Sequence, residues 1–439
     1  VRSNTTGSNN TGVGLNALNG NTTGANNVAV GAEALDANTT ASNNTAVGHA
    51  SLGVCTEGHS NTAVGQGAAE NITTGDHNVA IGRNSLGSQT TADNNVAIGQ
   101  SALFANTTGT SNVAIGSNAL DSNTTASNNT AIGVNSLGEN TTGTENVAVG
   151  AATLDANTTG GENTAVGYVA LGANTTGSNN VAVGRVSLDA NTTGQKNTAV
   201  GNGTLSANTT ADYNTALGFE SLALNTTADN NTGVGYYSLR SNTTGEQNTA
   251  VGKNALQACT TASFNTAVGA SALNALTTAA ECTAVGQAAL ASVTSAIQNT
   301  GVGVNAGSAI TTGAHNTCMG RNGGSGITTG TNNVAIGNYT INGTATGGSN
   351  VAVGYAALNQ VSSGSNNTAL GRNALKDQQT ASNNTGVGYE ALESNTTGVN
   401  NTAVGVDSLS TNTTGSSSVA VGLEALKLNP TGSANVGIG

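Results

Sequence analysis

The sequence predicts an all-β fold, a parallel β-solenoid of about 25 coils with 17 residues in each coil. The first observation is a 17-residue repeat that runs in register over residues 4–428 without insertion or deletion. The second is an apolar alternation that recurs once in every unit, as in a β-strand. Because a unit this short cannot bury a core alone, successive units are expected to stack on one another.

One period over nearly the whole chain predicts a single domain of stacked coils. Residues 1–3 lead in, residues 4–428 hold 25 units, and residues 429–439 form a partial terminal repeat. The section 293–343 is irregular, because Gly replaces Leu twice and the tract RNGGSG at 321–326 breaks the usual ending of a unit. We expect this section to be the weakest part of the solenoid, since each missing Leu removes buried apolar surface.

The first strand of each coil is read from three neighbouring positions, counting Asn4 as position 1 of its unit. Position 8 is Thr or Val, position 10 is Val, Ile, Leu or Met, and position 9 is small in every copy. Position 11 is Gly in all 26 copies, which predicts a turn with positive φ or a close backbone approach. These turn glycines include Gly14, Gly31, Gly48, Gly65, Gly82, Gly99 and Gly116.

A second inward-facing segment is expected from Leu at position 15, found in 21 of 25 units, and from Thr or Ser at position 3 of the next unit. Two short strands and two turns per coil follow, with a bend between positions 15 and 1 because strict alternation cannot turn both inward. Where Ala or Gly replaces Leu, Ile stands in place of Asn three residues later, which indicates that position 1 also faces inward. The pairs are Ala69 with Ile72, Gly307 with Ile310, and Gly324 with Ile327.

Asn occupies position 7 in 24 of 26 copies. Stacked one coil above another, these amides are expected to hydrogen-bond along the stack and to hold turn backbone groups. The predicted Asn ladder begins with Asn10, Asn27, Asn44, Asn61 and Asn78.

Composition narrows the choice of partners. With 22 acidic and 10 basic residues, the chain is not expected to bind nucleic acid or an anionic membrane. No apolar run is long enough for membrane insertion. We place any targeting or anchoring segment outside these residues. The four cysteines fall in different units and are expected to be buried thiols rather than disulfides.

The sequence offers no arrangement of residues for catalysis or for a cofactor. A metal cluster of His49, Cys55, His59 and His77 would need Cys55 to turn outward, whereas its position is expected to face inward. Acidic residues form no ladder in register, and no serine stands in a fixed relation to a His and an acid. We therefore expect no metal, no cofactor and no enzyme activity.

The segment NNVAIGQSAL at 94–103 resembles the NSVAIG-type repeats of trimeric autotransporter adhesin heads. The segment NTAVG at 197–201 and again at 401–405 resembles the NTAVGxxALxxNTTG arrays of tail-fibre proteins. The resemblance covers essentially the whole chain and implies a left-handed β-roll packed as a homotrimer, extracellular, on a virion tail fibre or a bacterial cell surface. In such a trimer the small residues of position 9 would abut the other two chains. The trimer face would then contain Ala29, Ala46, Ala63, Ala148 and Ala182.

The leading hypothesis for function is a structural fibre shaft or adhesin-type protein that supports attachment and has copies of itself as its main partner. A cell-surface receptor or glycan would be bound through parts outside this segment. A first alternative is an ice-binding solenoid with Thr ladders from positions 2 and 3, although one Thr of each pair is expected to face inward. A second is a fibre-borne polysaccharide depolymerase, which the lack of a paired carboxylate or an aromatic groove disfavours.

Overall fold

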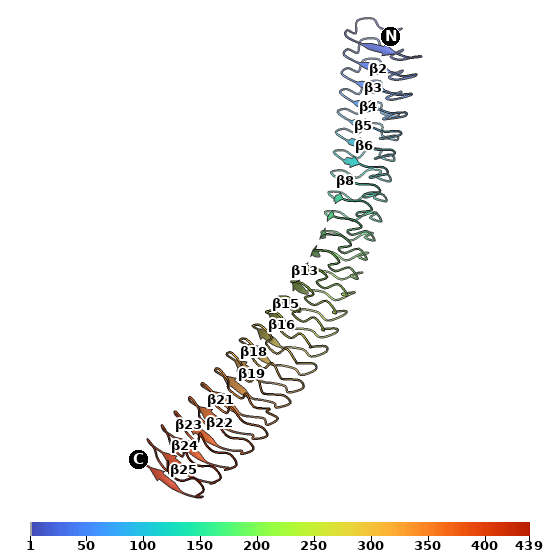
Figure 1. Cartoon of the computed structure of the whole chain (residues 1–439). Helices are drawn as coiled ribbons and strands as arrows, with labels where there is room; N and C mark the ends of the chain where they lie inside the picture. Colours follow the sequence, from blue (N-terminus) through green and yellow to red (C-terminus); the bar gives the residue numbers. More distant parts are fainter. Residues whose placement is uncertain (1) are drawn as a thin grey trace. The chain divides into compact units, whose positions relative to one another are not determined.

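The computed structural model describes residues 2–439 and shows a parallel β-solenoid with one short strand in each coil (Figure 1). The described residues contain no helix. The predicted fold class and the spacing of the repeat are therefore confirmed. The chain divides into two compact units, of which one ends at Leu217 and the other runs over Gly218–Gly439.

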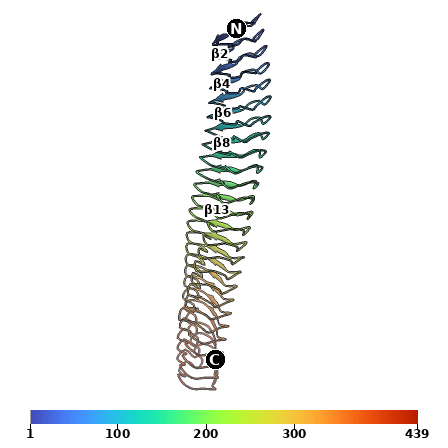
Figure 2. The ribbon, with the colours of Figure 1, turned by 90° about the vertical axis from the view of Figure 1, so that its right-hand side faces the viewer.

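The first unit contains 13 strands, each three residues long. Neighbouring strands are parallel and pair at equivalent positions of the repeat. Ala165, for example, is opposite Ala148 on one side and Ala182 on the other. Figure 2 shows these strands lying above one another as one column. They are β1 (Thr11–Val13), β2 (Val28–Val30), β3 (Thr45–Val47), β4 (Thr62–Val64), β5 (Val79–Ile81), β6 (Val96–Ile98), β7 (Val113–Ile115), β8 (Thr130–Ile132), β9 (Val147–Val149), β10 (Thr164–Val166), β11 (Val181–Val183), β12 (Thr198–Val200) and β13 (Thr215–Leu217).

The second unit repeats the same arrangement with the same register, for example Ala352 opposite Ala369. Its strands are β14 (Thr232–Val234), β15 (Thr249–Val251), β16 (Thr266–Val268), β17 (Thr283–Val285), β18 (Thr300–Val302), β19 (Thr317–Met319), β20 (Val334–Ile336), β21 (Val351–Val353), β22 (Thr368–Leu370), β23 (Thr385–Val387), β24 (Thr402–Val404), β25 (Val419–Val421) and β26 (Val436–Ile438).

The prediction of a second strand in each coil is wrong, because the remaining residues of the described coils form turns and bends. Each coil bends at positions 6, 13 and 15, where the backbone enters the left-handed region, as at Asn26 (φ 61°), Glu33 (φ 61°) and Leu35 (φ 49°). Residues with such φ values cannot continue an extended chain. Outside the strand the inward positions are 14, 15, 1, 4 and 7, mostly three residues apart and not two.

The core is thin and is made of one Leu, three small residues and two Asn in each regular coil. Leu35 at position 15, Ala34 at position 14 and Ala29 at position 9 are all 0% exposed. Position 1 faces inward as expected, because Asn21 and its replacement Ile72 are also 0% exposed. Position 3 does not face inward: its Thr side chains are exposed, and the hydroxyl at position 2 donates to the backbone of the next coil.

Two columns of Asn side chains join successive coils inside the solenoid. At position 7, the backbone N–H of Asn180 donates to Oδ1 of Asn163 (3.0 Å), and Nδ2 of Asn163 donates to the carbonyl of Gly177 (2.9 Å). At position 1, Nδ2 of Asn174 donates to Oδ1 of Asn157 (2.9 Å) and to the carbonyl of Gly177 (2.9 Å). Away from the terminal coils the Asn side chains of both columns are buried, so each amide replaces water as the partner of buried backbone groups.

The irregular section keeps its strand pairing but changes its core. Gly324 replaces Leu, and a Cβ built there would collide with Sγ of Cys318 and lie 3.1 Å from Cδ1 of Ile327. The volume of the missing Leu is thus taken by a larger residue at position 9 and by Ile at position 1. Ile327 pairs with Ala345 and not with Thr344, which is its equivalent in the next coil. This shift places a bulge in the stack.

We predict that Asn163→Ala lowers the free energy of unfolding, because it leaves the buried N–H of Asn180 without its acceptor and removes one of the two side-chain donors to the carbonyl of Gly177. The expected cost is about 1–3 kcal/mol for the unpaired N–H. Urea unfolding followed by circular dichroism measures it. The control is Asn202→Ala, which removes an exposed Asn from the same unit and should change stability by less than about 0.5 kcal/mol. Equal effects of the two substitutions would contradict a structural role for the buried column.

We predict that Gly324→Leu destabilises the protein by about 1–3 kcal/mol, because the site is already filled by Cys318 and Ile327. Adding Cys318→Ala and Ile327→Asn restores the side chains of a regular coil. The triple variant should then be more stable than the sum of the single effects by at least about 0.5 kcal/mol. Unfolding curves of the single and triple variants test this coupling, and strictly additive effects would show that the three positions do not share one space.

Candidate functional site

Each unit carries a strand face, by which we mean the side chains at positions 8 and 10 of β1–β13 in the first unit and of β14–β26 in the second. These Val, Ile, Leu, Met and Thr side chains point away from the core. Val28 is 36% exposed, Val30 37%, Ile132 37% and Val147 37%, while the small residue between them is buried. No position of the strand face carries a charged residue in any of the 26 strands. A face this apolar and this continuous is typical of an interaction surface.

The prediction that the small residues of position 9 contact other chains is wrong. Ala29, Ala46, Ala63, Ala148 and Ala182 are each 0% exposed within a single chain. They lie under the Leu and Asn columns of their own coil, which explains their small size. Gly233, which shares position 9, shows how little space remains there: a Cβ would lie 2.6 Å from Oγ of Ser221 and 3.3 Å from Cδ1 of Leu222. The constraint on size comes from the thin core and not from a neighbouring chain.

A glycine turn ends each strand and sets the edge of the strand face. Gly150 has a φ of 136°, and a Cβ on it would lie 2.5 Å from the carbonyl oxygen of Gly167 in the next coil. Both the backbone conformation and the close approach exclude a side chain at this position. The same geometry holds at the predicted turn glycines, whose φ values lie between 131° and 140°: Gly14, Gly31, Gly48, Gly65, Gly82, Gly99 and Gly116.

The Asn ladder expected from the sequence lies behind the strand face. The N–H of Asn27 donates to Oδ1 of Asn10 (2.9 Å), and the N–H of Asn44 donates to Oδ1 of Asn27 (2.9 Å). In the same way the N–H of Asn61 donates to Oδ1 of Asn44 (2.8 Å), and the N–H of Asn78 donates to Oδ1 of Asn61 (2.9 Å). Because position 7 directly precedes the strand, this column fixes where each strand begins.

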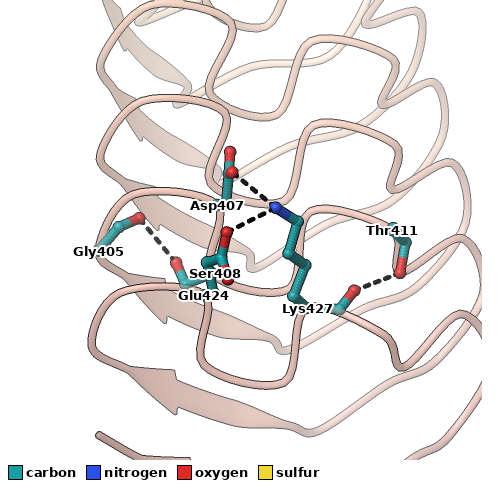
Figure 3. A network of polar contacts seen from close by, with 6 residues as sticks. All are labelled: Gly405, Asp407, Ser408, Thr411, Glu424 and Lys427. Carbon is teal, nitrogen blue, oxygen red and sulfur yellow. Dashed lines mark hydrogen bonds and ion pairs between the residues drawn. The ribbon is translucent and has the colours of Figure 1, made fainter.

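Charged residues gather beyond the glycine turn, at positions 12, 13 and 16. Figure 3 shows one such group, in which Nζ of Lys427 lies 2.9 Å from Oδ2 of Asp407 and 2.9 Å from Oε1 of Glu424. Hydrogen bonds to these carboxylates raise the pKa of Lys427. Arg240 and Glu220 form a second pair of this kind, with Nε and Oε2 2.7 Å apart. The pairs Lys427–Asp407 and Arg240–Glu220 join neighbouring coils, whereas Lys427–Glu424 lies within one coil. Each of these partly exposed pairs contributes little to stability.

The same surface carries two clusters of aromatic side chains in the second unit. Phe219 stacks on Tyr236 with ring centroids 5.6 Å apart, and Tyr237 lies 4.0 Å from Tyr236. Tyr339 meets Tyr355 edge to face at 6.1 Å. The clusters arise only when coils are stacked. The signal that could have revealed these clusters is the recurrence of aromatic residues at positions 12 and 13 of successive coils.

A small acidic hollow of about 170 Å³ lies in the first unit between Asp121, Glu139 and Asp155, with Asn118 and Asn135 beside them. Partial burial raises the pKa of Asp121 and of Asp155, and the charge of Glu139 adds to both shifts. Within residues 2–439 no group of three or more His, Cys, Asp or Glu side chains is arranged to hold a metal ion. Of the residues considered above, Cys55 is buried and His49 contacts Glu33 at 3.7 Å.

The four cysteines are free and buried. Burial raises the pKa of Cys259 and of Cys318 to about 12, from an ordinary value of 9.0. Thiolates are the reactive form, so these thiols are chemically inert in the folded protein.

We predict that thiol reagents at pH 8 label Cys259 and Cys318 only after unfolding. In the unfolded chain these thiols lose their protons near pH 9, and in the folded chain only near pH 12. The folded state therefore binds more protons between these values. Their contribution to stability is constant below pH 9 and is lost as the pH rises from about 9 to about 12. Labelling during a urea titration measures this, and rapid labelling of the native protein would contradict the burial.

None of the described residues belongs to a helix that is long and apolar enough to cross a membrane. No protein-family model matches the chain, and no curated protein matches it.

Proposed function

We propose that this chain is the shaft of an extracellular fibre, assembled from copies of itself through the strand face, that supports attachment to a surface without catalysing a reaction. The observation that carries the proposal is the strand face itself. In each unit position 10 forms an uninterrupted column of Val, Ile, Leu or Met side chains, position 8 beside it is Thr or Val, and neither position carries a charge. Covering such a face removes apolar surface from water and stabilises the assembly.

The period of the strand face favours a copy of the same chain as the partner. Its side chains repeat once in every coil, at the spacing of neighbouring parallel strands, which is about 4.8 Å. A partner can pack against many coils only when its own side chains recur at the same spacing. An identical chain meets this condition in every coil, whereas an irregular globular surface matches only a few.

The homotrimer and the left-handed roll implied by the resemblance complete this proposal. Three strand faces around one axis would leave none of the apolar columns in water, while the charged positions 12, 13 and 16 stay at the surface. Such a fibre fits a virion tail or a bacterial cell surface, where a receptor-binding part at its end would make the contact with the host. A shaft of this kind gains length by repeating one coil.

An ice-binding function is a second candidate that one observation favours. Thr side chains at position 3 are exposed and repeat once per coil. The expectation that one Thr of each pair faces inward, which counted against ice binding, therefore does not apply to the Thr column of position 3. Glu57 interrupts the column in the first unit. Thermal hysteresis of the purified protein decides between the two functions, since a fibre shaft has none.

We predict that charges on the strand face separate the chains without unfolding them. A variant with four Glu residues on the strand face should have the mass of one chain, 42.3 kDa, by light scattering and keep the β-sheet signal in circular dichroism. The cost of burying unpaired carboxylates, several kcal/mol for each, is avoided when the chains part. The four substitutions are Val149→Glu, Val166→Glu, Val183→Glu and Val200→Glu.

A matched control places four Glu residues at exposed position 3 of neighbouring coils in the same unit, where Glu57 occurs naturally. It should keep three times the mass of one chain. The opposite face of the strand gives a second comparison: Ala165→Glu should unfold the coil, because Ala165 is 0% exposed. A monomeric wild-type protein, or a strand-face variant that remains trimeric, would refute this assembly. The control substitutions are Thr142→Glu, Thr159→Glu, Thr176→Glu and Thr193→Glu.

A further inference from the structure

We propose that a hollow on the second unit, lined by Tyr339, Tyr355, Asn359, Arg372 and Lys376, binds a sugar ring that carries a carboxylate group. The inference goes beyond the proposed function, because it places a glycan site on the shaft itself and not on a receptor-binding part at its end. It follows from the shape of the hollow, from its two aromatic walls and from one guanidinium group that no carboxylate neutralises.

The hollow has a volume of about 440 Å³, within the range of about 300–1,000 Å³ that is usual for small-molecule sites. Its residues come from positions 12, 13 and 16 of successive coils. The rings of Tyr339 and Tyr355 meet at 77° with their centroids 6.1 Å apart, so they form a corner of two aromatic walls. A pyranose ring presents C–H groups on its faces and hydroxyls at its edge, and tyrosine offers both an apolar ring and a polar hydroxyl.

The charge of the hollow comes from Arg372. Its guanidinium carbon lies 5.8 Å from the ring centre of Tyr355 and 5.8 Å from that of Tyr389, so it sits between two rings. Among the described residues no carboxylate lies within ion-pair distance of Arg372, whereas Lys376 beside it is held by Glu393 at 3.2 Å. A guanidinium presents its N–H donors in a planar fork that fits both oxygens of a carboxylate. Arg372 is therefore the group that selects an acid.

The other residues of the hollow suit the hydroxyl groups of a sugar. Nδ2 of Asn359 donates to the backbone carbonyl of Tyr339 at 2.8 Å, which orients the amide and leaves its Oδ1 to accept a bond from a ligand. A long polyanion such as a nucleic acid is disfavoured, because the chain has a net charge of −12 and Glu390 and Glu393 lie nearby. A short acidic oligosaccharide carries few charges in total, so its carboxylate meets Arg372 at a smaller electrostatic cost.

The first unit contains a natural control for this site. Tyr168 and Arg185 occupy position 12 of two successive coils, as Tyr355 and Arg372 do. The next residue in that column is Asn202, whereas Tyr389 follows Arg372. The control pair thus supplies one tyrosine and one arginine at the same position of the repeat but lacks the second ring of the column.

The experiment measures binding of defined sugars to the full chain by saturation-transfer difference NMR and calorimetry. The probes are tetragalacturonate, which carries a uronic acid on every ring, and 3′-sialyllactose, which carries one sialic acid. Their neutral counterparts are galactotetraose and lactose. We expect at least one acidic sugar to bind and both neutral sugars to bind at least about tenfold more weakly, as the loss of one charged contact implies. The two acidic probes distinguish a uronic acid ligand from a sialic acid ligand.

The variants Arg372→Gln and Tyr355→Ala should each weaken binding of the acidic sugar about tenfold or more, while Arg185→Gln and Tyr168→Ala should leave it unchanged. Circular dichroism and the mass in solution should stay those of the wild type in all four variants, so that a failure of the fibre assembly is seen separately. Absence of binding by both acidic sugars, equal binding of the neutral sugars, or equal losses in the two pairs of variants would each overturn the proposal.

Discussion

Every coil depends on the coils above and below it for the partners of its backbone. The strand contributes only three residues per coil, so most inter-coil hydrogen bonds come from turns and bends, for example the N–H of Leu35 to the carbonyl of Ser51 at 3.1 Å. The two buried Asn columns complete the pairing where the turns leave groups open. Because an unpaired buried amide or carbonyl is costly, the spacing between coils cannot vary, and one register holds for strands, turns and side chains alike.

This fixed spacing explains both the thin core and the orientation of the strand. Each regular coil encloses one Leu, two Asn and small residues, and the strand adds only Ala or Gly to that interior. A larger residue fits at position 9 where Leu is absent, as with Cys318 beside Gly324. The large residues of the strand must then face outward. An apolar outer face and a small-residue inner face are thus two results of one packing constraint.

The sequence predicts the period, the strand, the glycine turn and the Asn column because each recurs at one position of the repeat. It does not predict which side of the strand is inside, since alternation distinguishes two faces without assigning either to the core. Val at positions 8 and 10 is the more apolar choice, but Ala is the one that fits beside Leu and Asn. The expectation of a second strand fails because left-handed residues such as Leu35, which periodicity does not reveal, break the extended backbone.

The sequence alone does not predict the hollow beside Tyr355, for a related reason. Its residues belong to successive coils, and each one alone resembles a variable surface residue. Stacking brings them together because positions 12, 13 and 16 lie on one side of every coil. The buried positions of the repeat specify the fold, so the outer positions are free to differ from coil to coil. A site can therefore be built by changing a few outer residues in adjacent coils, and recognition in a solenoid is expected where those positions depart from the common pattern.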